Sequence, residues 1–239
     1  MDHQEGWDSL KDILVILAHP DDPEFFLGGT IARWAKAGHR VRYTLLTKGD
    51  KGAKDDTLSA DKIMSIREQE QAQAAQSLGV LSIDYLDYED GYLFPNLEMR
   101  KDVVRSIRQH RPHILVTCDP TNLFPSQQYL NHPDHRYAGQ VVLDALFPAA
   151  GNAFFFPELL DEMYLPHSVE EVWLSLTNQA DVCLDVTPYW NDRLEALKHH
   201  ASQIGDLDEF ERHMIERVQK DNQQGFTYEE SFRRIVFRR

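Results

Sequence analysis

The chain has 239 residues, of which 25 are Lys or Arg and 39 are Asp or Glu, so its formal net charge is -14 and its pI about 5.1. Because such a surface repels phosphate groups, we expect no nucleic acid partner. Residues 1–5 lack the basic and apolar parts of an export signal, and the apolar runs are shorter than the ~20 residues of a membrane-spanning helix. We therefore expect a cytoplasmic protein without membrane insertion, and the two cysteines, Cys118 and Cys183, predict no disulfide framework.

The first half of the chain alternates between predicted strands and predicted helices. A continuous aliphatic run at residues 13–17 indicates a strand buried on both faces, which is typical of a parallel sheet covered by helices. Further strands are expected at residues 40–46, 83–86 and 113–117, and helices at residues 27–37, 60–78 and 97–110. This alternation predicts an α/β fold with three layers, α/β/α, around a mostly parallel sheet.

The second half is less regular. It predicts helices at residues 133–146, 189–203 and 207–219, strands at residues 171–176 and 181–186, and a long loop at residues 147–157. The arginines at 233, 234, 238 and 239 are interpreted as surface or subunit contacts. Because no linker or repeat separates the halves, we expect a single domain over residues 1–239. Ligand sites of such a domain lie beyond the carboxyl ends of the parallel strands.

A cluster of polar side chains follows the first predicted strand directly, in the segment AHPDDPE at residues 18–24. His19 and Asp22 can ligate a divalent metal ion, which leaves Asp21 between them as a free carboxylate. The alternative is an acidic turn that caps a helix. Capping needs neither the histidine nor two aspartates, so the metal interpretation is favoured.

A second cluster, NHPDHR at residues 131–136, follows the strand at residues 113–117 and begins another helix. His132 and His135 are three positions apart and lie within one helical turn, so one can bind a metal while the other faces a substrate. Such a pair alone is weak, since histidines often face solvent at helix starts. Together, the two clusters supply a three-ligand catalytic metal site with an open fourth position.

Both segments resemble the LmbE-like or PIG-L superfamily of zinc-dependent de-N-acetylases, of the N-acetylglucosaminyl deacetylase type. The resemblance extends to GGT at residues 28–30, to TKGDKG at residues 47–52 and to REQE at residues 67–70. It implies an LmbE-like fold with a Rossmann-like sheet. It also implies roles for individual residues: zinc ligands His19, Asp22 and His135, general base Asp21, and oxyanion contact His132.

The resemblance implies less direct roles for three further residues. Asp134 would orient His132 and favour its charged form, and Arg67 would contact sugar hydroxyls of the substrate. An arginine on a helix is otherwise more often solvated or ion-paired. Glu24 matches the family motif, and we expect it to support the turn rather than to react.

The implied reaction is hydrolysis of a linear amide C–N bond. The enzyme would remove the N-acetyl group from a small N-acetylglucosamine-type derivative through a zinc-bound water, releasing acetate and a free amine. Either Asp21 or His132 could be the general acid, and Fe2+ accepts the same ligands as Zn2+. Alternatives are a zinc amidase acting on another acylated amine, or a noncatalytic sugar- or metal-binding protein of the same fold. The presence of both Asp21 and His132 speaks against the latter.

Two segments leave alternatives open. Residues 48–56 follow the second predicted strand and could form a mobile rim of the site or a plain solvated loop. The aromatic run at residues 154–156 could line a pocket, pack in the core, or form a contact within a homo-oligomer. Some sugar-thiol deacetylases of the family carry a tyrosine two positions before the residue equivalent to His132, where this chain has Leu130 preceded by Tyr129.

Overall fold

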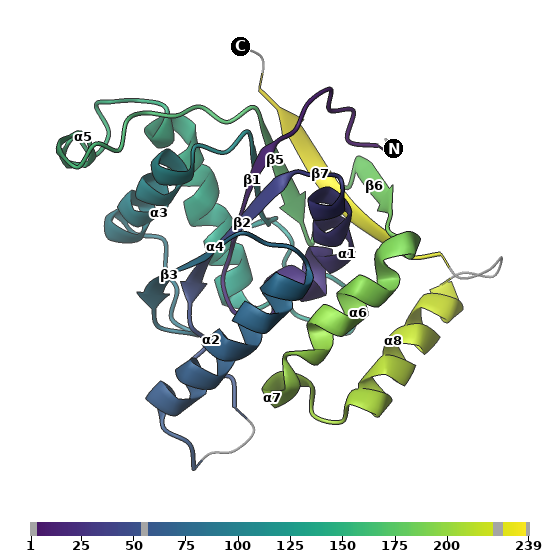
Figure 1. The fold of residues 1–239 in the computed structure, drawn as a ribbon. Coiled ribbons are helices and arrows are strands. Elements are labelled where there is room, and N and C mark those ends of the chain that lie inside the picture. The colour runs from purple at the N-terminus through teal and green to yellow at the C-terminus, as the bar shows by residue number, and fades with distance from the viewer. Residues whose placement is uncertain (1–3, 54–56, 222–226, 238–239) are drawn as a thin grey trace.

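The computed structural model describes residues 4–53, 57–221 and 227–237, and within them both halves of the chain contribute to one seven-stranded sheet (Figure 1). The strands are β1 (Asp12–Leu17), β2 (Arg40–Thr47), β3 (Ile83–Tyr88), β4 (Ile114–Cys118), β5 (Glu171–Ser175), β6 (Val182–Asp185) and β7 (Glu229–Val236). Their order in the sheet is β3-β2-β1-β4-β5-β7-β6. The first five strands in this order are parallel, whereas β7 runs antiparallel to both of its neighbours.

Helices cover both faces of the sheet. They are α1 (Asp22–Lys36), α2 (Ala60–Ser77), α3 (Leu97–His110), α4 (Pro133–Asp144), the π-helix η1 (Ala145–Ala150), α5 (Glu158–Asp161), the 3-10 helix η2 (Thr187–Tyr189), α6 (Trp190–Lys198), α7 (Ala201–Ile204) and α8 (Leu207–Asp221). Figure 1 shows α1, α2 and α6 on one side of the sheet and α3 and α4 on the other. The predicted three-layer α/β fold is confirmed by this arrangement.

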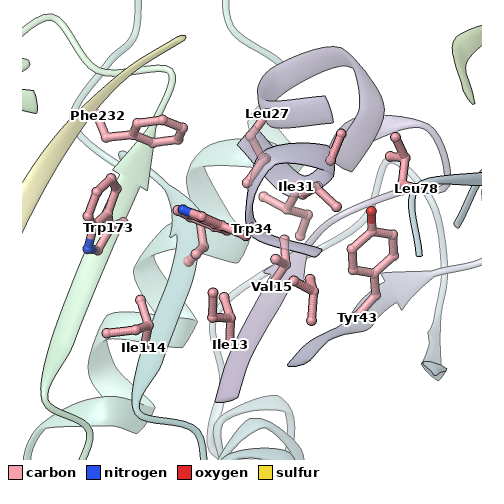
Figure 2. Close-up of a cluster of buried hydrophobic side chains, with 14 of the residues drawn as sticks. Ile13, Val15, Leu27, Ile31, Trp34, Tyr43, Leu78, Ile114, Trp173 and Phe232 are labelled. Atoms are coloured by element: carbon pink, nitrogen blue, oxygen red, sulfur yellow. The ribbon is translucent and has the colours of Figure 1, made fainter. Parts of the chain in front are cut away.

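The central strand β1 explains why two helical layers form. Successive side chains of a strand point to opposite faces. Ile13 and Val15 therefore pack with the α1 side, in the cluster drawn in Figure 2, whereas Leu14 and Ile16 pack with α3 and α4. Because both faces of this strand are buried, its carboxyl end is held rigidly where the site begins.

Helix α1 begins five residues earlier than the sequence predicts. Asp22 and Glu24 provide the acidic first turn, Pro23 occupies a position where its missing N–H costs nothing, and the chain kinks at Leu27, whose φ is -152°. The kink divides α1 into a first turn that carries the site residues and a longer part that packs on the sheet. The sequence-based boundary at residue 27 coincides with this kink.

Strand β7 was not predicted, and the expectation of surface contacts for its arginines is only partly matched. Phe232 is fully buried in the core, as Figure 2 shows, while Arg234 pairs with Glu171 on the neighbouring strand β5 at 2.6 Å. A charged residue in the sequence suggests an exposed position, but here Arg234 lies in a strand and is neutralised by Glu171 on the next strand. The short helix α5 follows the predicted loop at residues 147–157, and residues 147–150 of that loop belong to η1.

Two further expectations concern the whole chain. Among the described residues, the structure holds no helix long and apolar enough to cross a membrane. The prediction of a single domain stays a prediction, and it is supported by the sheet, in which β7 lies between β5 and β6. Of the predicted rim at residues 48–56, residues 54–56 lie outside the described part.

Candidate active site

The two sequence clusters meet at the carboxyl edge of the sheet. His19 follows β1 directly and His135 lies in the first turn of α4, whose chain arrives from β4, the parallel neighbour of β1. Gly139 allows α4 to approach closely, because a Cβ atom there would lie 2.2 Å from the carbonyl oxygen of Cys118. The close approach brings the start of α4 against the end of β1.

Asp22 lies between the two histidines. Its Oδ1 is 3.0 Å from Nε2 of His135, and its Oδ2 is 3.4 Å from Nδ1 of His19 and accepts the backbone N–H of His19 at 2.9 Å. All three side chains are at least nine-tenths buried. Burial opposes the charge of Asp22, but His135 and His19 outweigh burial and hold the pKa of this carboxyl below its usual range. The three predicted metal ligands are thus brought together.

The outer nitrogen atoms of both histidines have partners of their own. Nδ1 of His135 lies 3.1 Å from Oδ1 of Asn131, and Nε2 of His19 lies 3.1 Å from Asp90 and 3.2 Å from Asp134. A histidine that donates one N–H to such an acceptor presents the lone pair of its other nitrogen. The nitrogen atoms left over, Nδ1 of His19 and Nε2 of His135, are those that face Asp22.

Metal-binding capacity is not confined to the predicted set. Among the described residues, two groups of three bring ligand atoms within 4.8 Å of one another: His19 with His132 and His135, and His19 with Asp90 and Asp134. His19 belongs to both groups. The surplus of carboxylates around it is the kind of charge that a divalent cation compensates.

Asp21 takes an unusual backbone conformation at the beginning of α1. Its φ is 81°, in the left-handed region that a non-glycine residue rarely adopts. Arg67 lies 3.2 Å from its carboxylate, and Gln71 accepts its backbone N–H at 2.7 Å. Burial raises the pKa of Asp21 to about 6; Arg67 acts against this rise, and the neighbouring Asp22 reinforces it. A carboxyl with such a pKa can exchange a proton near neutral pH.

Arg67 is buried and lies at the inner wall of the site. Its guanidinium donates to the carbonyl oxygens of Pro20 at 2.7 Å and Gly49 at 3.2 Å, besides contacting Asp21. These contacts hold the turn after β1 and the loop after β2. The guanidinium also lines the cavity, and the predicted contact with sugar hydroxyls stays a prediction.

His132 is the N-cap residue of α4 and lines the same cavity. Its Nδ1 accepts the backbone N–H of Asp134 at 3.1 Å, so in the neutral ring the proton is on Nε2. Burial lowers the pKa of His132, and the imidazoles of His19 and His135 lower it further. Asp134 acts in the opposite direction, as the resemblance implies, but its effect is smaller than those of burial and of the two imidazoles.

The carboxylate of Asp134 is fully buried and has different neighbours from those expected. One oxygen, Oδ2, accepts the backbone N–H of Gly91 at 2.7 Å and lies 3.2 Å from Nε2 of His19. The contact that the structure gives between Asp134 and His132 is made by the backbone. Asp134 is therefore placed to act on His19.

Sequence reasoning missed Asp90, Gln71 and His200. Asp90 follows β3, just as the first cluster follows β1, so its place at the same sheet edge was a usable signal. Gln71 lies within α2 and His200 just before α7. Their neighbours in the site are far away along the chain, and no motif marks them.

The site opens into a cavity of about 1060 Å³. Its lining combines polar side chains with the apolar or aromatic side chains of Phe25, Tyr129 and Leu176. The remaining lining residues are His19, Asp21, Asp22, Phe26, Lys51, Gly52, Arg67, Asp90, Gly91, Pro125, Ser126, Gln128, His132, His135 and Gln203. The aromatic run at residues 154–156 is absent from this lining: Phe155 and Phe156 pack against the core, and Phe154 is exposed.

Residues 14–146 match the family model described as PIG-L, GlcNAc-PI de-N-acetylase. This chain belongs to the PIG-L family. Diacetylchitobiose deacetylase of Thermococcus kodakarensis is 34% identical over 200 residues, which cover 84% of this chain and 73% of that protein. A 1D-myo-inositol 2-acetamido-2-deoxy-alpha-D-glucopyranoside deacetylase of Rhodococcus erythropolis is 27% identical, with 82% of each chain covered.

A solved structure supports the same assignment. N,N'-diacetylchitobiose deacetylase from Pyrococcus horikoshii superposes on this chain with a TM-score of 0.87 at 29% identity, covering 98% of this chain and 87% of that one. The predicted family, the α/β fold and the enzyme class, a deacetylase that hydrolyses amide bonds, are confirmed by these comparisons.

Proposed function

We propose that this enzyme removes the N-acetyl group from an N-acetylglucosamine unit of a small saccharide or glycoside. The observation that carries the proposal is the position of Asp21. This buried carboxyl has a pKa of about 6, and it lies beside His19, Asp22 and His135 without being one of the proposed ligands. A proton acceptor next to a metal site is what amide hydrolysis requires.

We propose His19, Asp22 and His135 as the ligands of a zinc ion, with Fe2+ able to occupy the same donors. Two imidazoles and one carboxylate match the ligand types of catalytic zinc, and the site faces the cavity, where a fourth position can stay open. The group of His19, Asp90 and Asp134 is less suitable. Asp134 is fully buried and is not among the residues that line the cavity.

The chemistry can be divided among the residues of the chain. Zinc, when bound, would polarise the acetamide carbonyl and make a water molecule more acidic. Asp21 accepts the proton of the attacking water, and Arg67 holds the Asp21 carboxylate in place during the transfer. His132 donates its Nε2–H to the oxygen that becomes negative. Asp21 then returns the proton to the leaving amine.

The size and charge of the cavity support the saccharide as substrate. A volume of about 1060 Å³ lies just above the ~300–1,000 Å³ typical of small-molecule pockets, so it can hold more than one sugar ring. The lining holds aspartates beside Lys51 and Arg67, and charges of both signs suit a ligand without net charge. Both relatives described above are named for substrates that contain a 2-acetamido sugar linked to a second ring.

Acetate release tests the proposal directly. N-acetylglucosamine, N,N'-diacetylchitobiose and N-acetyllysine would be incubated with the enzyme as prepared, after chelation, and after re-addition of Zn2+ or Fe2+. We expect acetate from the sugars, loss of activity with chelator and recovery with metal. Turnover of acetyllysine without turnover of any sugar would instead favour an amidase acting on other acylated amines.

The other proposals concern where the enzyme acts and in which form. We propose a cytoplasmic enzyme, supported by two buried free cysteines, Cys118 and Cys183. We also propose a homo-oligomer, supported by Phe147 and Phe154, whose side chains are exposed. Sedimentation of the wild type and of a Phe147→Ser, Phe154→Ser double variant would test the second of these proposals.

A further inference from the structure

Helix α2 holds Asp21 at two points. Arg67 and Gln71 lie four positions apart, on the same face of this helix. Arg67 contacts the carboxylate of Asp21 at 3.2 Å, and Oε1 of Gln71 accepts the backbone N–H of Asp21 at 2.7 Å. The side chain and the backbone of Asp21 are therefore both fixed by residues outside the AHPDDPE segment.

The amide of Gln71 can take only one orientation. The backbone N–H of Asp21 can only donate a hydrogen bond, and Nε2 of Gln71 lies 3.1 Å from each carboxylate oxygen of Glu24. Oε1 of Gln71 must therefore face the N–H of Asp21. Gln71 and Glu24 are both fully buried, so water does not substitute for either contact.

Glu24 is itself fixed from two other elements. The hydroxyl of Tyr43 on β2 donates to its Oε1 at 3.2 Å, and Nε2 of His200 lies 3.1 Å from its Oε2. His200 is completely buried and lies outside the residues that match the family model. A buried hydrogen-bonded network thus leads from β2 and from the segment before α7, through Glu24 and Gln71, to the backbone of Asp21.

This network bears on the left-handed conformation of Asp21. Such a conformation is unfavourable for a residue with a Cβ atom, so it persists where neighbours impose it. We propose that Gln71 and Glu24 are positioning residues that hold Asp21 in this conformation and thereby aim its carboxylate at the reacting centre. The inference rests on the proposed function in so far as Asp21 is the general base.

Replacement of Gln71 by methionine tests the proposal, because it keeps the length of the side chain and removes the hydrogen bonds to Asp21 and Glu24. In the zinc-loaded enzyme we expect kcat to fall by ~100-fold, as is typical of a misaligned catalytic group, with KM changed by less than about threefold. Zinc content should remain equal to that of the wild type, since the proposed ligands are not contacted. Gln73, exposed on the same helix, provides the control Gln73→Met, which should behave like the wild type.

A reciprocal exchange separates the hydrogen bonds from simple packing. Gln71→Glu alone places two carboxylates in contact and should lower kcat at least as much as Gln71→Met. In the double variant Gln71→Glu, Glu24→Gln, the new amide can donate to the new carboxylate, which again accepts the N–H of Asp21. We expect this double variant to recover kcat at least tenfold over Gln71→Glu. Equal activity of the single and double variants would contradict the proposal.

Crystal structures of the zinc-loaded wild type, Gln71→Met and Gln73→Met give a result that does not depend on turnover. In Gln71→Met, Asp21 should leave its φ of 81°, whereas the control should keep it. An unchanged Asp21, or a kcat equal to that of the control, overturns the inference. If the wild type deacetylates no substrate, the proposed function fails on its own, and the conformation of Asp21 still decides whether Gln71 positions it.

Discussion

The carboxylate of Asp134 lies 3.2 Å from Nε2 of His19, a residue 115 positions earlier in the chain. A carboxylate in this position orients a metal-bound imidazole and makes it a better donor. We expect Asp134→Asn to weaken zinc binding by ~10–100-fold, the usual loss for such an outer partner. The measurement is a zinc titration against a competing chelator, with the exposed Asp61→Asn as control. Unchanged zinc affinity with a reduced kcat would instead favour the role through His132 that the resemblance implies.

His132 is predicted to act on the substrate rather than on the metal. Because its Nδ1 accepts a backbone N–H and its Nε2 is left for the cavity, His132→Ala should lower kcat by ~100–1,000-fold, the typical cost of losing an oxyanion contact. Zinc content should not change. Acetate release and metal analysis would be compared with His213→Ala, a replacement of an exposed histidine. Loss of zinc together with activity would place His132 among the ligands.

Glu230 is predicted to stabilise the fold. From β7 its buried carboxylate accepts the backbone N–H groups of Gly29 at 3.0 Å and Thr30 at 2.7 Å, just after the kink in α1, and lies 3.5 Å from Nε of Arg193. Glu230→Ala would remove this buried acceptor from both N–H groups and the opposite charge from Arg193. We expect the free energy of unfolding to fall by about 3 kcal/mol in urea titrations. The neighbouring exposed Glu229→Ala is the control, and an equal loss in both variants would contradict the assignment.

His39 should make stability depend on pH. Its Nδ1 accepts the backbone N–H of Lys11 at 2.9 Å, which only the neutral ring can do, and burial lowers its pKa below the ordinary 6.5. A lowered histidine pKa means that the unfolded chain binds the proton more readily. The stabilisation that neutral His39 gives to the fold is therefore present above pH 6.5, and it is lost as the pH falls through the pKa that His39 has in the folded protein. Melting temperatures of the wild type and His39→Ala should differ at pH 7.5 and converge toward pH 5; a constant difference would exclude this linkage.

The sequence pattern predicts best those strands and helices whose residues all have the same kind of surroundings. Strand β1 is buried on both faces, so a continuous aliphatic run reports it almost to the residue. His19, Asp21 and Asp22 follow this strand directly, and their common location could therefore be inferred from the end of the strand. The contacts that these residues make could not be inferred in this way, because a partner such as Asp134 reaches His19 from another helix.

Other parts of the molecule depend on pairing across the fold. Strand β7 carries arginines that look like surface residues until Glu171 on β5 is placed opposite Arg234. Gln71 is one of several glutamines on α2, and only the packing of this helix over the turn after β1 distinguishes it. No periodicity or spacing in the sequence reports such relationships.

The position of β7 near the end of the chain affects the order in which parts of the fold can form during synthesis. Every proposed ligand and catalytic residue, and also His200, precedes residue 201, and the parallel strands β1 to β5 are complete at Ser175. Strand β7 is translated later, yet it provides both the partner of the β5 edge and Glu230, which caps α1 beyond its kink. The residues proposed for catalysis are therefore synthesised before β7, the strand whose Glu230 stabilises helix α1.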